Sequence, residues 1–490
     1  MFSSLIFWIV LYLVISIGIG LYAARRVKTD NDYILAGRGL PLYIVIATTF
    51  ATWFGSETVL GTSSTFLDEG ISGILADPFG AGLCLILVGL FFARPLYRMG
   101  IQTLGDFYRQ KYGRTVEVLA SIMIIISYIG WVSAQIVALG LVFDIISEGT
   151  ILTALTQTQW SFIGGGIVLI YTIFGGMWSV AMTDFFQMII IMIGMLLVAW
   201  YVGDDAGGMT NVVSTAIADG KFSLFGTEGM TWAGIIAVLS AVLTMGFGSI
   251  PQQDVFQRVL SANSEKNSGR GAVIGGSLYI VFAFVPIMLG YAAYMVAPEL
   301  LGTEDTQRIL PTLILEKTPL LMQVMFFGAL LSAIMSTASG TLLAPSALFA
   351  ENIMKPFLPN ITRPKLLLLT RLSVFGTFLI IMSFVAYKYA HNEARIFDMV
   401  ESAYKITLAG AFVPLVFGIY KKKVHTINAL LSMLVGVGTW ISVEFFLERE
   451  MIFGLEPHFF AFLISIPAFF AGDMIAKWAG GTRNEGENMK

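Results

Sequence analysis

The sequence predicts an all-α integral membrane protein with about thirteen transmembrane helices. Composition is the first reason: 56% of the 490 residues are hydrophobic and only 12% are charged, whereas a soluble domain carries about 25% charged residues. Apolar runs of at least about 18 residues, enough to cross a bilayer, recur along the chain. Because the stretches between them are too short for a separate soluble domain, we expect 1–490 to be a single polytopic membrane domain.

The predicted spans follow one another closely. In order they are 3–23, 42–62, 74–96, 119–146, 158–175, 178–201, 230–251, 271–296, 321–350, 365–387, 399–419, 426–447 and 452–476. The first span has no basic residue before it and no small-residue cleavage site, and Arg25 and Arg26 follow it directly. We therefore predict a retained span with its N-terminus outside, not a cleaved signal peptide.

The basic residues predict the orientation of the remaining spans. If the spans alternate in direction, 21 of the 29 Lys and Arg residues fall on one side and seven on the other, and Arg371 lies inside a span. Short cytoplasmic loops carry the excess of basic residues. The C-terminus is therefore expected in the cytoplasm, and the protein in the plasma or inner membrane.

Several function classes lack support in the sequence. No GxxxxGK[ST] phosphate loop is present, so the chain should not use ATP. The basic residues are dispersed and do not form a nucleic-acid-binding patch. No span contains a nucleophile-base or metal-ligand pair, which argues against an enzyme. The single cysteine, Cys84, excludes an internal disulfide.

Two spans contain residues that interrupt a membrane helix. Span 2 carries the stretch TFATWFGSETVLGT, and span 7 carries AVLTMGFGSIPQQDVFQRVL. Both include the tripeptide FGS, at 54–56 and 247–249, and the spans are five apart. Broken helices at matching places of two repeats are typical of transporters and hold the solute and ions. We predict inverted repeats over 42–201 and 230–419, although a single glycine can also be a packing notch.

Span 9 places hydroxyl groups on one helix face. Ala333, Ser336, Thr337, Ser339 and Gly340 lie at spacings of three and four residues. Hydroxyl oxygens there, with carbonyls freed where span 2 unwinds, would suit a hard cation. The alternative is that these hydroxyls bond to their own backbone carbonyls.

Four stretches carry a resemblance to a known family. They are GGMWSVAMTDFFQMIIIMIG, DNDYILAGRGLP, PQQDVFQRVLSA and AIMSTASGTLLAPSALFAENI. With them the chain resembles the sodium:solute symporter family, nearest to bacterial relatives of the high-affinity choline transporters in the branch of the sodium-proline symporters. The resemblance implies the five-plus-five inverted-repeat fold of the leucine transporter, with broken helices at spans 2 and 7. It also implies sodium-coupled import of a small polar solute, and a non-transporting membrane sensor on the same fold is the alternative.

The resemblance implies where sodium would bind. The first site would consist of the carbonyls of Ala51, Phe54 and Ala333 and the side chains of Ser336 and Thr337. A second site would use Tyr171, Asp184, Ser336 and Ser339. Gly340 stands where a further hydroxyl residue is expected, which removes one ligand. The cofactor is therefore one sodium ion, or two.

The resemblance also implies a solute site at the two breaks. Trp53 and Trp131 stand where two rings of a choline-binding aromatic cage would be, while the other two positions hold Ala81 and Gln252. We predict that Trp53, Glu57, Trp131, Phe247 and Gln252 line the cavity. A carboxylate and an amide can accept N–H donors, which favours an amine-bearing solute such as an amino acid or a choline-like compound.

Glu57 has other interpretations. It could bond to a neighbouring hydroxyl, such as that of Ser56 or Thr58, or it could couple transport to protons. The solute would then be neutral or anionic.

Overall fold

The computed structural model describes residues 4–148, 150–225, 230–298, 306–391, 396–447, 451–452 and 455–478. This part of the chain is almost entirely helical, and its isolated β-bridges are Leu40 with Ala262 and Ile452 with Leu455. The longer helices are α1 (Ser4–Ala24), α8 (Arg114–Ser147), α9 (Gln157–Asp205), α11 (Trp232–Gly248), α13 (Glu265–Val296), α15 (Leu320–Leu348), α16 (Arg363–Ala390), α19 (Thr426–Ile441) and α20 (Pro457–Trp478).

Shorter helical segments complete the spans and connect them. They are α2 (Asp30–Leu35), α3 (Leu42–Trp53), η2 (Glu57–Gly61), α4 (Thr62–Glu69), η4 (Leu75–Gly80), α5 (Ala81–Leu87), η5 (Val88–Phe92), α6 (Ala93–Arg98), α7 (Leu104–Tyr112), α10 (Met209–Ala218), α12 (Gln253–Leu260), α14 (Ile309–Lys317), η10 (Phe349–Met354), α17 (Ile396–Thr407), η12 (Leu408–Phe412), α18 (Val413–Tyr420) and η13 (Ser442–Phe446). Side-chain caps start several of these helices; for example, Thr103 and Asp106 form a capping box on α7.

The predicted number of spans agrees with the structure once α9 is counted as two crossings. Ten continuous helices and two bent pairs in the described residues are long and apolar enough to cross a membrane. At about 1.5 Å per residue, the 49 residues of α9 are roughly twice as long as one crossing requires. The helix is interrupted at Gly176, whose φ of 51° favours glycine. Its two parts correspond to the predicted spans 158–175 and 178–201.

The two predicted breaks are present and have nearly the same geometry. Span 2 bends by 55° between α3 and the segment Glu57–Ser72, and span 7 bends by 56° between α11 and α12. The all-α fold with broken helices at spans 2 and 7 is therefore confirmed. The repeat boundaries, 42–201 and 230–419, stay a prediction.

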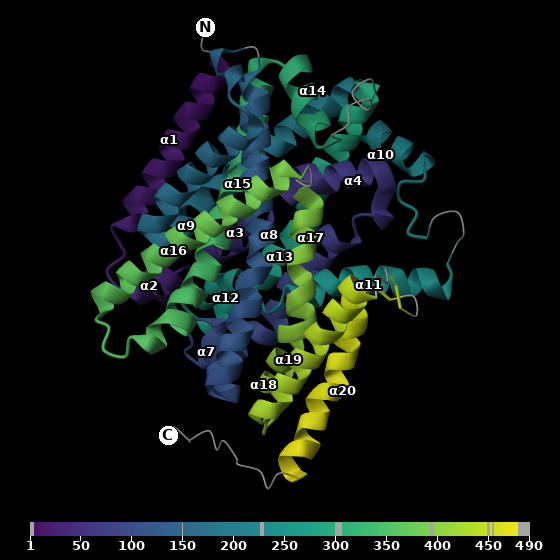
Figure 1. Ribbon diagram of the computed structural model, residues 1–490. Helices are drawn as coiled ribbons and strands as arrows, with labels where there is room; N and C mark the ends of the chain where they lie inside the picture. Colours follow the sequence, from purple (N-terminus) through teal and green to yellow (C-terminus); the bar gives the residue numbers. More distant parts are fainter. Residues whose placement is uncertain are drawn as a thin grey trace.

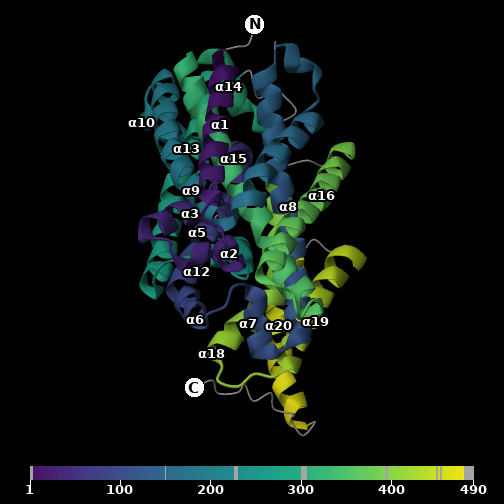
Figure 2. The same ribbon diagram turned by 90° about the vertical axis from the view of Figure 1, so that its left-hand side faces the viewer.

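The helices pack around the two breaks. In Figure 1, α1 starts near the N-terminus at the top of the view and α20 ends at the bottom. Helix α9 packs most extensively against α15, and α8 packs against α9, α15 and α17. Helices α19 and α20 form a pair that contacts the remainder mainly at η12. Figure 2 shows α10 and α13 on one side of the molecule and α16 and α19 on the other.

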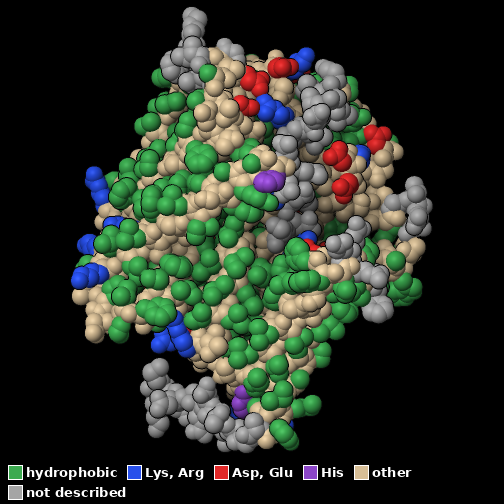
Figure 3. Space-filling model, in the orientation of Figure 1, with side chains coloured by type: hydrophobic (Ala, Val, Ile, Leu, Met, Phe, Trp, Pro, Cys, Tyr) green, Lys and Arg blue, Asp and Glu red, His purple; other side chains and the backbone are tan. Residues whose placement is uncertain are grey.

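The outer surface suits a lipid environment. Large apolar side chains are exposed along several spans, as in α1 at Trp8, α9 at Trp200 and α16 at Leu372. In Figure 3 hydrophobic side chains cover the middle of the visible face, while most of its acidic and basic side chains lie toward the upper edge and the lower left. An apolar surface of this extent would be unstable in water but is stable against acyl chains.

Candidate functional site

The break in span 2 brings three polar groups together around Gly55. Helix α3 ends at Trp53, and the φ and ψ of the next residue, Phe54, −87° and 78°, lie outside the helical region. A methyl group on Gly55 would lie 2.4 Å from Glu57 Oε2, 2.7 Å from Thr337 Oγ1 and 3.0 Å from Gln135 Oε1. The amide N–H of Ser56, freed by the break, donates to Gln135 Oε1 at 3.0 Å. Only glycine leaves room for these groups to converge.

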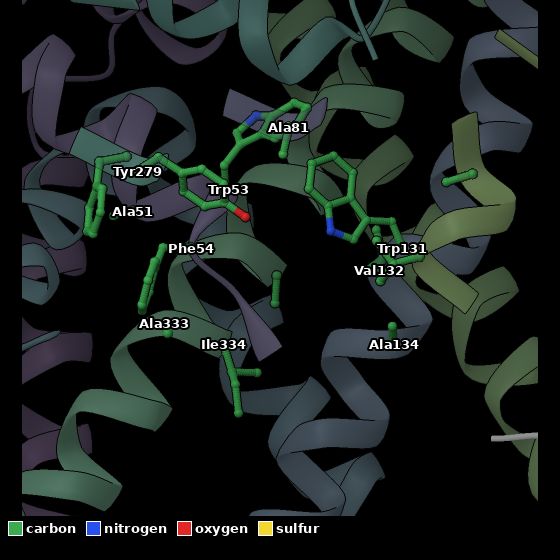
Figure 4. Packing of buried hydrophobic residues seen from close by; sticks show 14 of the residues in the cluster. Ala51, Trp53, Phe54, Ala81, Trp131, Val132, Ala134, Tyr279, Ala333 and Ile334 are labelled. Carbon is green, nitrogen blue, oxygen red and sulfur yellow. The ribbon is translucent and has the colours of Figure 1, made fainter. Parts of the chain in front are cut away.

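The proposed first sodium site includes a hydroxyl group that lacks a partner. Thr337 is fully buried, and its Oγ1 has no hydrogen-bond partner among the described residues. Helix α15, which carries it, packs against α3, and Figure 4 shows Ala51, Phe54 and Ala333 in the same region. A buried hydroxyl without a partner is costly unless something else satisfies it. The residues therefore fit a cation, and their role as ligands stays a prediction.

The residues of the second candidate site already bond to the protein. Asp184 is fully buried and accepts hydrogen bonds from three hydroxyls: Thr48, Thr52 at 3.3 Å and Ser336 at 2.7 Å. Tyr171 donates to the carbonyl of Met335 at 2.8 Å. Ser339 donates to the carbonyl of Ser336 at 3.0 Å, as the alternative interpretation of span 9 expects.

A buried cation that was not predicted from the sequence lies beside this group. Arg258 follows the break in span 7, lies in α12 and is only 1% exposed. Its Nε donates to Thr52 Oγ1 at 2.8 Å, and its Nη1 donates to the carbonyl of Asp254 at 2.9 Å. The sequence signal for a buried charge here was the pair Asp254 and Arg258, opposite charges four residues apart directly after a helix break.

Three aromatic rings pack around Trp131 and form with it a cluster of four. The centroids of Trp53 and Trp131 are 5.3 Å apart in an edge-to-face arrangement, which Figure 4 shows. Tyr128 stacks on Trp131 at 6.1 Å, and Tyr404 packs edge-on at 6.0 Å. Trp53 Nε1 donates to Asp254 Oδ2 at 3.1 Å, and the Tyr128 hydroxyl also bonds to this carboxylate. Tyr128, Tyr404 and Asp254 were not predicted from the sequence: Tyr128 lies one turn before Trp131 on α8, while Tyr404 and Asp254 come from α17 and α12.

Glu57 bonds to two residues from span 4. Trp131 Nε1 donates to its Oε1 at 3.0 Å, and Gln135 Nε2 donates to its Oε2 at 2.7 Å. The structural partners of Glu57 are thus Trp131 and Gln135, rather than Ser56 or Thr58. A carboxylate with about four lone pairs can accept further donors, so a direct contact with solute stays a prediction.

The other predicted solute-site residues lie in different surroundings. Gln252 is fully buried; its Nε2 donates to Ser127 Oγ at 3.4 Å, while its Oε1 has no partner among the described residues. The ring of Phe247 stacks on Phe412 at 4.9 Å and contacts Phe462. The described contacts of Phe247 therefore place it with η12 and α20, not in the aromatic cluster around Trp131.

The chain is similar to a family model and to several known transporters. The model of the sodium:solute symporter family matches residues 33–436. The high-affinity choline transporter 1 of Drosophila melanogaster is 26% identical over 480 residues, covering 94% of this chain and 72% of the relative. The high affinity choline transporter 1 of Homo sapiens is 29% identical over 403 residues, covering 76% of this chain and 66% of the relative. The sodium/glucose cotransporter 4 of Homo sapiens is 23% identical over 473 residues, covering 88% of this chain and 67% of the relative.

Solved structures agree on the fold. A sodium-coupled sialic acid symporter in a substrate-bound outward-open state aligns with a TM-score of 0.82 at 18% identity, covering 98% of both chains. The transporter Mhp1 in a closed conformation aligns with a TM-score of 0.59 at 14% identity, covering 90% of this chain and 95% of its own.

Proposed function

Because this chain belongs to the sodium:solute symporter family, and is thus a transporter and not an enzyme, we propose that its solute is a small compound bearing a positively charged amine. Sodium and the solute would bind at the two helix breaks and cross by alternating access. The observation that carries this proposal is the cluster of four aromatic rings with two buried carboxylates, Glu57 and Asp254, bonded to it.

The charges favour a cation. Ring faces attract cations, and carboxylates in a dry interior favour a positive partner. The Tyr404 hydroxyl, buried in the same cluster, has no hydrogen-bond partner among the described residues. An anionic solute would meet repulsion from both carboxylates and from the ring faces.

Gln252 favours an amine that carries N–H groups. Its Oε1 is a buried acceptor without a described partner, and Ser127, which its amide contacts, directly precedes Tyr128 of the cluster. A primary or secondary ammonium group can donate to such an oxygen, whereas a quaternary one cannot.

A quaternary ammonium solute is the second candidate. Two curated relatives are named as choline transporters. Tyr128 and Tyr404 supply rings that the sequence analysis found missing at Ala81 and Gln252. The four rings together are sufficient for a cation–π site.

A methylation series distinguishes the two candidates. Ethanolamine, its mono- and dimethyl derivatives and choline share one skeleton and differ in the number of N–H donors. We expect the half-saturating concentration for sodium-driven uptake into proteoliposomes to rise along the series. Gln252→Met keeps the size and removes the acceptor, so it should flatten this trend. If choline is the best substrate of both proteins, the amide does not contact the solute, and if none of the four compounds is taken up, the amine proposal is wrong.

We infer that sodium binds the first site, formed by Ala51, Phe54, Ala333, Ser336 and Thr337. The unpartnered Oγ1 of Thr337 supports this assignment, and Ser336 can donate to Asp184 while its lone pairs face an ion. Thr337→Ala and Ser336→Ala should each raise the half-saturating sodium concentration at least tenfold, whereas potassium should not replace sodium.

Thr341→Ala is the matched control for this test. Thr341 lies one turn along the same helix, and its hydroxyl donates to the carbonyl of Thr337 at 2.7 Å. We expect its sodium dependence to stay within about twofold of the native protein. Equal effects of Thr337→Ala and Thr341→Ala would show that the loss is structural.

The protein is proposed to lie in the plasma or inner membrane, with its N-terminus outside and its C-terminus in the cytoplasm. The excess of basic residues in alternate loops supports this orientation. A non-transporting sensor would bind the same amine without accumulating it, so uptake into sealed vesicles separates the two functions.

A further inference from the structure

We propose that Arg258 takes the place of a second sodium ion, so that the transporter couples each solute molecule to one sodium ion. This inference rests on the proposed function and concerns its stoichiometry. It starts from Asp184, the buried carboxylate of the second candidate site.

Arg258 and Asp184 are connected through one hydroxyl group. Arg258 Nε donates to Thr52 Oγ1 at 2.8 Å, and Thr52 Oγ1 donates to Asp184 Oδ2 at 3.3 Å. A buried carboxylate needs a positive partner, and Arg258 supplies one that is covalently attached.

The absence of a hydroxyl side chain at Gly340 and the position of the Arg258 guanidinium are linked, because both concern the same volume. A methyl group on Gly340 would lie 2.0 Å from Arg258 Nη2 and 3.0 Å from its Cζ. The guanidinium therefore fills the volume in which a serine side chain at 340 would have to lie. Arg258 Nη2 has no hydrogen-bond partner among the described residues. Packing and charge, rather than a hydrogen bond from this nitrogen, therefore hold this end of the guanidinium in place.

The two candidate sodium sites also differ in how far the protein satisfies them. The Asp184 carboxylate, at the second site, already accepts hydrogen bonds from Thr48, Thr52 and Ser336, so most of its lone pairs are occupied. Thr337 Oγ1, at the first site, has no described partner. An ion at Asp184 would lie near a buried guanidinium of the same sign, whereas an ion at Thr337 would satisfy an unpaired oxygen. The residues present fit one sodium ion and not two.

The direct test is the flux ratio of the native protein. Purified protein in proteoliposomes should transport radioactive sodium and its best amine substrate in a ratio of one to one. A ratio of two sodium ions per solute would overturn this inference and leave the proposed function intact. Uptake without any sodium flux would overturn both.

Two variants test the role of Arg258. Arg258→Gln combined with Gly340→Ser removes the fixed charge and restores the hydroxyl, so the flux ratio should rise toward two. The Hill coefficient for sodium should rise from about one toward about two. A ratio that stays at one in a folded double variant would show that Arg258 does not exclude the second ion.

A single variant keeps the test decisive if the double variant does not fold. Gly340→Ala places a methyl group where the guanidinium lies, so we expect at least a tenfold loss of sodium-driven uptake. Gly328→Ala is the matched control on the same helix, because its methyl group would meet only Ile190 Cγ2, at 3.9 Å. Equal activity of the two variants would contradict the position of Arg258 over Gly340.

Discussion

Gly55→Ala tests the convergence of groups at the break in span 2. The substitution is conformationally neutral, because the φ of Gly55 lies outside the left-handed region, but its methyl group conflicts with three oxygens. The closest conflicts are with Glu57 Oε2 at 2.4 Å and Thr337 Oγ1 at 2.7 Å. Ordinary contacts begin at 3.4 Å, so Glu57 Oε2 has to move by about 1 Å.

The geometry sets the expected magnitude. Overpacking of this kind costs about 1–3 kcal/mol, and about 1.4 kcal/mol corresponds to a tenfold change in an equilibrium constant. Because the displaced atoms are a proposed ion ligand and the carboxylate beside it, the cost should fall on ligand binding. We expect the half-saturating sodium concentration to rise about 5- to 150-fold.

Sodium-dependent thermal shift and uptake into proteoliposomes measure this change, and gel filtration checks that the variant is folded. Gly166→Ala is the control, since a methyl group there meets nothing within 4 Å, and it should bind sodium like the native protein. If Gly55→Ala binds sodium within twofold of the control, the break in span 2 does not form the ion site.

Three further predictions concern charge, hydrogen bonding and orientation. Glu57→Gln should raise the half-saturating solute concentration at least tenfold, because a charge-assisted hydrogen bond contributes about 1.5–3 kcal/mol. It should also weaken sodium binding, since Glu57 Oε2 and Thr337 Oγ1 both lie beside Gly55. Unchanged uptake kinetics would refute both roles. Tyr404→Phe should lower solute affinity about fivefold, the effect of losing one neutral hydrogen bond, without lowering thermal stability; a loss of stability alone would indicate a packing role. Cysteines introduced in 94–118 or 421–423 should be protected from an impermeant thiol reagent in intact cells, while one near Gly207 should react. The reverse labelling pattern would show that the orientation is inverted. Glu304, expected on the same side as Gly207, lies outside the described residues.

The spans and their breaks could be predicted from the sequence because the signals are local. Hydrophobic length fixes a span, and glycine or proline beside polar residues marks an interruption, as at Gly55 and Pro251. The boundary between the predicted spans 158–175 and 178–201 is a kink inside the continuous helix α9, at Gly176.

The partners within the site could not be predicted. Gln135 lies 78 residues from Glu57 in sequence, and Arg258 lies 206 residues from Thr52. Such pairs depend on how the half-helices tilt after each break, which periodicity does not specify. The family resemblance indicated the positions of Trp53 and Trp131. It did not indicate Arg258, which we propose replaces an ion, or Tyr128 and Tyr404, which supply the other two rings.

The fixed guanidinium of Arg258 bears on what drives accumulation. Since it stays with the protein, one sodium ion and one singly charged amine move two positive charges inward per cycle. Each charge gains about 2.3 kcal/mol from about 100 mV, whereas a tenfold sodium gradient adds about 1.4 kcal/mol. The total of about 6 kcal/mol would hold the amine at a ratio on the order of 10⁴ across the membrane. Most of the amine gradient depends on voltage. The amine gradient should therefore collapse when a potassium ionophore clamps the membrane potential at zero, even while the sodium gradient is maintained.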